Sequence, residues 1–299
     1  MQSKLHSITY REYAKTELLT KAYENSSDPI ERMKYLCAYF ISGLYKSPDF
    51  CRSKAPFNPI LGETYQAVQP DGSEIYLEQT LHYPPTFNYL LYGPSKHYQM
   101  MGYGTINAHM DGLNTIRGWR DGKNLIKFDD GSIITFTNFL TRINGIMMGD
   151  RIYNYYGTQT IKDFKNKIEC TIVLEDQEKE GVISKIFSKK KIVQYDEFKI
   201  EIKQLNPETK EKELKATGYG SWLGQLYFGD KCYWSYFDSS PEWVQDNLWI
   251  LPSDSTKRED LIYVIKGDIE NAQIHKDRLE EVQRQDQKKR DEYKKTISK

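Results

Sequence analysis

Residues 78–85, with the sequence EQTLHYPP, place a carboxylate, an amide and an imidazole directly before two prolines. Adjacent prolines force an extended backbone and end any helix or central strand. A polar cluster on such a rigid turn is typical of a recognition site, in which His82 and Tyr83 offer hydrogen bonds to a ligand. A single histidine such as His82, taken alone, is more often a turn residue whose ring the backbone satisfies.

A second segment with recognition chemistry covers residues 54–64, with the sequence KAPFNPILGET. Its two prolines are three residues apart and fix an extended, non-helical path. Asn58 lies between them and offers both hydrogen-bond donors and an acceptor. Lys54 precedes them and adds a flexible positive charge. The segment is therefore a second rigid stretch that carries polar side chains.

Near the C-terminus, Lys276, Glu280 and Arg284 are spaced by four residues. Successive members of such a series drift by only about 40° around a helix, so all three share one face. Taken alone, this spacing indicates a ladder of ion pairs on a solvated helix.

Periodicity predicts helices at the two ends of the chain. Asp28 followed by proline is typical of a helix start, and apolar residues at helical spacing continue to Leu44. A less regular helix is expected from about Tyr10 to Tyr23. Towards the C-terminus, a capping box at residues 256–259 predicts a helix through Ile265. Gly267 would end that helix, and Asp268 would cap a final helix that runs to the C-terminus.

Strand signals fill the part of the chain between these helices. Apolar and polar residues alternate over 168–175 and over 198–203, which predicts strands with one solvated face. Asp-Gly pairs at 71–72, 121–122 and 130–131 predict hairpin turns. Many short strands with regular turns favour a meandering antiparallel sheet that curls into a barrel.

The charges of this chain balance, with 42 basic and 42 acidic residues among 299. The molecule as a whole therefore lacks the positive field that gathers nucleic acid, and we expect no nucleic-acid partner. The five histidines and four cysteines fit no metal-ligand spacing. The glycines match neither a phosphate loop nor a nucleophile elbow. We therefore predict no metal, no cofactor and no catalytic residue.

The N-terminus has no apolar secretory leader, and no apolar run is long enough to span a membrane. Both features predict a cytoplasmic protein with reduced thiols. Any contact with organelle membranes would then be peripheral and transient.

Together, the polar segments resemble motifs of the oxysterol-binding-protein-related lipid transfer family. Residues 78–85 resemble EQVSHHPP, residues 54–64 resemble KPFNPLLGET, and residues 248–255, LWILPSDS, resemble WPLPxDS. The matches occur in the family's order and extend from about residue 15 to about residue 290. The chain departs from the pattern at Tyr83, which replaces a histidine, and at Ala55, which replaces a lysine.

The resemblance implies a mainly β fold: a large, nearly closed antiparallel β-barrel with a lipid tunnel, flanked by N-terminal and C-terminal helices. It implies one lipid-binding domain over residues 1–299, with helices in 1–50, the barrel in 60–240 and a helical region in 241–299. It also implies extraction of a sterol or phospholipid from membranes, in exchange for phosphatidylinositol 4-phosphate. Such a tunnel shelters the lipid tail, at about 0.8 kcal/mol for each methylene.

The resemblance further assigns the polar residues to the lipid headgroup, which must stay at the tunnel mouth. Lys276 and Arg284 would contact the phosphates, and Glu280 would orient them. The other predicted headgroup contacts are Lys54, Asn58, His82 and Tyr83. Lys54 stands one residue before the family's lysine, and such a shift reverses side-chain direction in extended backbone. The neutral Ala55 and Tyr83 remove up to two cationic contacts, which predicts either weaker phosphoinositide binding or a preference for a different headgroup.

Two other functions remain compatible with the sequence. A lipid sensor or scaffold would bind the same ligands without net transfer between membranes. An esterase-like enzyme on a β scaffold would require a catalytic triad whose members lie far apart in the sequence.

Overall fold

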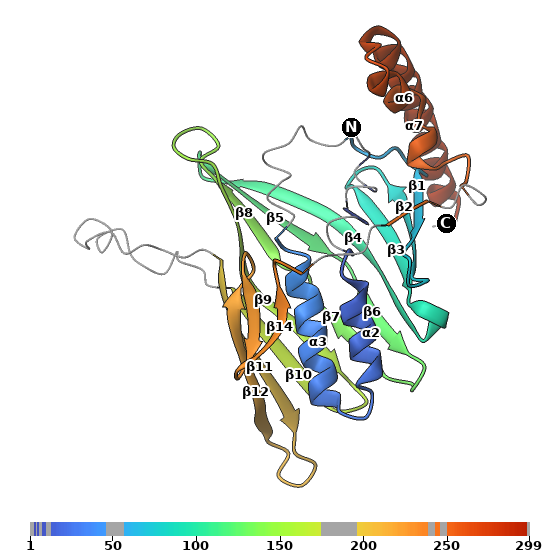
Figure 1. Cartoon of the computed structure of the whole chain (residues 1–299). Helices are drawn as coiled ribbons and strands as arrows, with labels where there is room; N and C mark the ends of the chain where they lie inside the picture. The colour runs from blue at the N-terminus through green and yellow to red at the C-terminus, as the bar shows by residue number, and fades with distance from the viewer. Residues whose placement is uncertain are drawn as a thin grey trace.

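Antiparallel strands form the centre of the molecule, with helices packed against them, in the computed structural model (Figure 1). The structure describes residues 3, 5, 8, 9, 13–45, 57–174, 196–238, 243–245 and 250–297. The helices in these ranges are α2 (Thr16–Glu24), α3 (Pro29–Ser42), η1 (Pro94–Lys96), η3 (Ser255–Lys257), α6 (Glu259–Ile265) and α7 (Ile269–Ile297).

The strands follow one another along most of the chain between α3 and η3. Their bounds are β1 (Thr64–Val68), β2 (Glu74–Leu81), β3 (Thr86–Tyr92), β4 (Tyr98–Asp111), β5 (Thr115–Asp121), β6 (Asn124–Phe128), β7 (Ile133–Phe136), β8 (Leu140–Asn144), β9 (Ile152–Asp163), β10 (Ile168–Leu174), β11 (Glu197–Leu205), β12 (Lys212–Ser221), β13 (Gln225–Phe228) and β14 (Lys231–Ser235).

Within the described residues these elements form one antiparallel sheet of 14 strands. Between the long strands β4 and β9, the pair β5–β8 occupies one half of the sheet and the pair β6–β7 occupies the other half. The edge strands β1 and β14 do not pair with each other in the described part of the chain, so the ring is only partly closed. The predicted mainly antiparallel fold with flanking helices is confirmed.

The predicted hairpin at Asp121-Gly122 is wrong. β5 and β6, which this pair connects, do not pair with each other but lie one after the other along the same edge of β4. A Cβ atom on Gly122 would lie 1.8 Å from the carbonyl oxygen of Tyr103, so the glycine marks a close approach of two backbones. The Asp-Gly pairs at 71–72 and 130–131 do form the predicted turns, between β1 and β2 and between β6 and β7.

α3 begins where its sequence predicts. Asp28 Oδ1 accepts hydrogen bonds from the backbone N–H groups of Ile30 and Glu31, both at 3.0 Å, and Pro29 occupies the first turn. α2 begins later than predicted, at Thr16, and the residues at 13–15 before it are not helical. Lys15 provides no side-chain cap for α2, so the sequence carries no strong signal for its start.

The buried face of α3 packs on the inner face of the sheet. Cys37 Sγ lies 3.3 Å from Cys170 Sγ of β10, and both thiols are fully buried. Arg32 is also buried, and it donates hydrogen bonds to Asp130 Oδ2 at 2.7 Å and to Ser132 Oγ at 2.9 Å in the turn between β6 and β7. These contacts hold α3 inside the curled sheet.

The start of α6 differs from the prediction. The expected capping box at 256–259 does not form, because Asp254 caps η3 instead: its Oδ1 accepts a hydrogen bond from Thr256 N at 2.8 Å. Arg258 then precedes α6 and provides no side-chain cap. Its guanidinium is engaged elsewhere, in the ion pairs described below.

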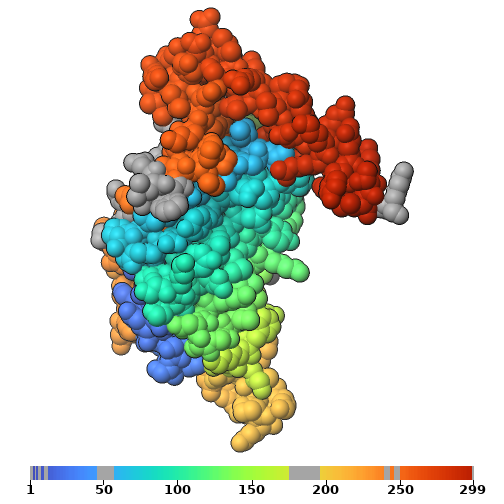
Figure 2. Space-filling view, turned by 90° about the vertical axis from the view of Figure 1, so that its right-hand side faces the viewer, coloured from blue at the N-terminus to red at the C-terminus, as the bar shows by residue number. Residues whose placement is uncertain are grey.

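The remaining C-terminal signals are confirmed. α6 ends at Ile265, followed by Gly267 in the left-handed region at φ +80°. Asp268 Oδ1 accepts from Asn271 N at 3.0 Å, and α7 continues to Ile297. Figure 2 shows α7 across the end of the sheet that contains β1, with its last turns projecting beyond the body. Within the described ranges, no helix has the length and apolar character needed to cross a membrane.

Candidate functional site

A cavity of about 450 Å³ lies between α3 and the inner face of the sheet. Strands β3, β4, β5, β8 and β9 supply most of its wall. The wall is largely apolar or aromatic and includes Tyr39, Phe40, Phe87, Tyr89, Met100, Ile106, Ile116, Phe136, Phe139 and Ile143. A cavity of this size and lining is typical of a site for a small organic ligand.

Gln159 on β9 places a polar group in this wall. Its Nε2 donates a hydrogen bond to Thr137 O at 2.8 Å, and the residue is 2% exposed. The side-chain oxygen Oε1 is buried and has no hydrogen-bond partner in the described part of the chain. A buried acceptor without a donor costs free energy. Gln159 therefore places a hydrogen-bond acceptor close to the cavity, although almost none of the surface of this oxygen is open to it.

Asn58 and His82 meet at a second, smaller cavity of about 40 Å³. His82 directly follows the end of β2, and Asn58 lies in the segment before β1. Ile8, Phe87 and Ile106 line both cavities, so the small one adjoins the large one. The structure thus brings these two predicted headgroup residues together beside the apolar cavity.

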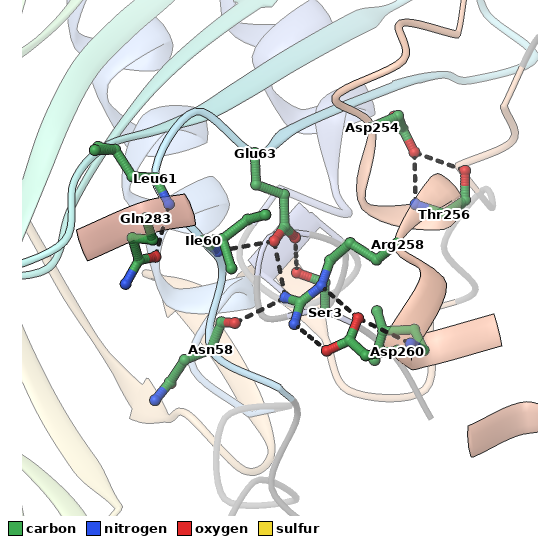
Figure 3. A network of polar contacts seen from close by, with 11 residues as sticks. Ser3, Asn58, Ile60, Leu61, Glu63, Asp254, Thr256, Arg258, Asp260 and Gln283 are labelled. Atoms are coloured by element: carbon green, nitrogen blue, oxygen red, sulfur yellow. Dashed lines mark hydrogen bonds and ion pairs between the residues drawn. The ribbon is translucent and has the colours of Figure 1, made fainter. Parts of the chain in front are cut away.

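A buried ion network joins this segment to the C-terminal region (Figure 3). Arg258 Nη1 lies 2.8 Å from Glu63 Oε2, and its Nη2 lies 2.6 Å from Asp260 Oδ2. Arg258 Nη1 also donates to the carbonyl oxygen of Asn58 at 2.8 Å, while the side-chain amide of Asn58 points away from the network. Ser3 Oγ donates to the other oxygen of Glu63.

Burial and charge act against each other in this network. Burial raises the pKa of the Glu63 carboxyl, although the positive charge of Arg258 acts in the opposite direction. Burial also lowers the pKa of Arg258, but the hydrogen bond to Asp260 and the charge of Glu63 outweigh it and leave the pKa raised. Arg258 therefore stays charged, and it fixes the backbone on which Asn58 lies.

The predicted ladder on α7 is present. Glu280 Oε1 lies 3.6 Å from Lys276 Nζ, and Glu280 Oε2 lies 3.9 Å from Arg284 Nη1. Gln283 turns towards the segment before β1, because its Oε1 accepts a hydrogen bond from Leu61 N at 2.9 Å. At 100° for each residue, Lys276 lies within about 20° of Gln283 around the helix, Glu280 within about 60° and Arg284 within about 100°.

The structure brings the seven predicted headgroup residues together only in part. Among the described residues, no hydrogen bond or ion pair joins the α7 ladder to Asn58 or His82. Tyr83 is 88% exposed and lines neither cavity. Lys54 lies outside the residues that the structure describes.

Several residues of the site were missed by the sequence analysis. Glu63 belongs to the segment 54–64, which the sequence marks as informative. Arg258 lies in the expected capping box, and neighbouring residues give no sign that it pairs with Glu63, which is far away in the sequence. Gln159 was missed because alternation does not tell which face of a strand points inward.

The family model for oxysterol-binding protein matches residues 3–299 of the chain. Oxysterol-binding protein 9 of Dictyostelium discoideum is 31% identical over 288 residues, which cover 92% of this chain and 65% of that protein. Oxysterol-binding protein-related protein 6 of Homo sapiens is 26% identical over 318 residues, which cover 93% of this chain and 30% of that protein. The chain thus spans less than two thirds of the length of these relatives.

Solved structures share the fold. The Osh3 ORD of Saccharomyces cerevisiae, in complex with PI(4)P, superposes with a TM-score of 0.77 at 20% identity, covering 96% of this chain and 77% of that one. The Osh1 ORD domain in complex with ergosterol superposes with a TM-score of 0.73 at 19% identity, covering 98% and 74%. With a family model that matches nearly its whole length, and with this fold, the chain belongs to the oxysterol-binding protein family.

Proposed function

We propose that the protein binds a sterol or a phospholipid in its central cavity and carries it between membranes, in exchange for phosphatidylinositol 4-phosphate. The observation that carries this proposal is the largely apolar cavity of about 450 Å³, with Gln159 among the residues of its wall. A sterol matches both properties, because its ring system is apolar and it carries one hydroxyl group. The hydroxyl would donate to Gln159, and the cavity would exclude water from the rings.

The crystallised relatives support these ligand classes. The Osh3 ORD structure contains PI(4)P, and the Osh1 ORD structures contain ergosterol and cholesterol. For this chain we propose the same two classes, with Asn58 and His82 as headgroup donors where the small cavity adjoins the large one. Lys276 and Arg284 would supply the charge, and Glu280 would keep both cations on one face of α7. Lys54 and Tyr83 remain proposed contacts of the same headgroup.

A sterol-binding measurement without membranes tests the proposal. Radiolabelled cholesterol is delivered from cyclodextrin to the wild-type protein and to Gln159→Leu, which removes the acceptor but keeps an apolar wall. We expect the variant to bind cholesterol about two- to tenfold more weakly, the cost of one lost neutral hydrogen bond. Cholesterol methyl ether, which cannot donate, is the matched ligand and should bind both proteins equally. Absence of cholesterol binding by the wild-type protein would refute the sterol assignment.

Transfer is tested separately from binding. Cholesterol should pass from donor to acceptor vesicles faster when the protein is added, and binding without acceleration would instead identify a lipid sensor or scaffold. We infer that no catalytic step is involved, and mass spectrometry of the incubated lipids should find them unchanged. We also place the protein in the cytoplasm, in transient contact with membrane surfaces.

A further inference from the structure

Two hairpin turns at one end of the sheet expose large apolar side chains. The turn between β4 and β5 exposes Leu113 at 86%, and the turn between β8 and β9 exposes Met147 at 74% and Met148 at 79%. Both turns lie at the upper left of Figure 1, where β4 and β8 end and β5 and β9 begin. One exposed apolar residue is ordinary, but three on neighbouring turns at a protruding end require an explanation.

Asn114 ties the two turns together and satisfies their backbone. Its Oδ1 accepts hydrogen bonds from Met147 N at 2.8 Å and from Met148 N at 2.9 Å, and its Nδ2 donates to Met148 O at 2.9 Å. Its carbonyl oxygen accepts from Ile146 N at 3.2 Å. In the apolar part of a bilayer no water is available for backbone polar groups, so these bonds must be made within the protein. Asn114 provides such bonds for the backbone N–H groups of residues 146–148 and for the carbonyl oxygen of Met148.

Charge at this end of the sheet is balanced. Asp111 Oδ2 lies 2.6 Å from Arg117 Nε, and the exposed Asp150 and Arg151 carry opposite charges in adjacent positions. An attraction of the turns to a partner would therefore depend on apolar burial and only weakly on salt.

The exposed turns continue into the cavity wall. Met110 is paired with Ile116 across β4 and β5, and Ile116 is paired with Ile143 across β5 and β8. Ile116 and Ile143 line the cavity, and Met110 is 52% exposed beside the first turn. Apolar side chains thus lie on the turns and also on the strands that lead from the turns to the cavity wall. A lipid route along these strands would join the turns to the cavity.

We propose that the turns at residues 111–114 and 145–151 form a membrane-insertion tip, in which Leu113, Met147 and Met148 enter the interfacial layer of a lipid bilayer. Contact of the tip with a bilayer is inferred from the exposed side chains of the two turns alone. The lipid route into the cavity, by contrast, rests on the proposed function. A bilayer fits better than a protein partner. A stable protein interface buries about 800 Å² on each side and is anchored by aromatic or arginine residues, and three side chains on a protruding tip offer neither.

Sedimentation with vesicles of neutral phosphatidylcholine tests the tip. The variant Leu113→Ser/Met147→Ser/Met148→Ser should bind at least about tenfold more weakly, because burying even one such side chain corresponds to about that factor. Phe164→Ser/Leu214→Ser is the matched control, since these exposed apolar residues lie at the opposite end of the strands. The control should bind like the wild type, and wild-type binding should change less than about twofold between 0.05 and 0.5 M salt.

Uptake of cholesterol from cyclodextrin separates this proposal from the proposed function, because it needs no membrane. Equal uptake by the triple variant and the wild type would show an intact cavity, so weaker vesicle binding would come from the tip. If neither protein takes up cholesterol and only the variant loses vesicle binding, the sterol assignment is wrong and the tip is supported. Normal vesicle binding by the variant, an equal loss in the control, or no binding by the wild type would overturn the tip.

Discussion

Arg258 is the residue on which the arrangement of the predicted headgroup segment depends. It is the cation between Glu63 and Asp260, and both carboxylates are almost fully buried. Its hydrogen bond to Asn58 O also links the segment before β1 to the start of α6. A buried charge whose partner is removed cannot recover its solvation, so this network is sensitive to one substitution.

Replacing Arg258 by alanine should lower the free energy of unfolding by about 3–5 kcal/mol, because two buried carboxylates lose their cation. Urea unfolding at pH 7 measures this change. Lys289→Ala is the matched control: Lys289 is 75% exposed and lies 3.7 Å from Asp286. Such surface pairs contribute less than about 1 kcal/mol. Similar losses in the two variants would show that the Arg258 network has no special role.

Removal of the two cations of the α7 ladder should weaken the binding of one ligand class and leave the other unchanged. Lys276→Ala/Arg284→Ala should extract phosphatidylinositol 4-phosphate from vesicles at least about tenfold less well, because each charged hydrogen bond contributes about 1.5–3 kcal/mol. Cholesterol uptake from cyclodextrin should not change, since neither residue lines the cavity. Lys288→Ala/Lys289→Ala on the same helix is the charge-matched control. Unchanged phosphoinositide extraction by the first variant would remove α7 from the headgroup site.

At the scale of elements, α3 is held to the sheet by a buried cation. Arg32 is 1% exposed, lies 4.5 Å from the ring centre of Phe128, and pairs with Asp130 at 2.7 Å in the turn between β6 and β7. Burial alone would raise the pKa of Asp130, but hydrogen bonds from Arg32 and Ser132 lower it from 3.8 to about 2. Since α3 forms one side of the cavity wall, this pair also positions the cavity.

The lowered pKa of Asp130 predicts how stability depends on pH. The folded state holds the ionised form, so this contribution is complete above about pH 4 and is lost as the pH falls towards 2. Allowing for the screening of a partly exposed carboxylate, it amounts to about 1 kcal/mol. Asp130→Asn should therefore flatten the decline in unfolding free energy between pH 4 and pH 2, measured by urea titration. An equally steep decline in the variant would contradict a contribution from this pair.

At the scale of the whole molecule, the curled sheet leaves a cavity where a solid core would otherwise be. Its wall combines strands from β3 to β9 with α3, so a bound ligand would contact elements that are distant in sequence. A ligand that binds only the folded state stabilises all of these elements together.

Cholesterol at a concentration of about 100 times its dissociation constant should therefore raise the free energy of unfolding by about 2.7 kcal/mol. Scanning calorimetry should show an increase of about 5 °C in the midpoint, as one cooperative transition. Cholesterol methyl ether at the same concentration should give a smaller increase, because it cannot donate to Gln159. An unchanged midpoint with cholesterol would contradict binding in the cavity.

Some residues of the candidate site could be predicted from the sequence, and others could not. Asn58 and His82 were chosen from two proline-bounded segments, and the structure places both at one small cavity. The ladder of Lys276, Glu280 and Arg284 followed from helical spacing. The assignment of these residues to a headgroup stays a prediction. The residues that the sequence did not reveal, Arg258 and Gln159, act through contacts with distant parts of the chain.

The sequence by itself determined the local structure: the Asp28 cap of α3, the alternation of β10 and β11, and the Gly267 end of α6. These features depend on the backbone preferences of neighbouring residues, which act within a few positions. Only the tertiary structure decided that β5 and β6 share one edge of β4, which strand faces line the cavity, and that Arg258 pairs with Glu63. Strand order, register and buried charge pairs depend on contacts between distant segments, and no local pattern encodes these contacts.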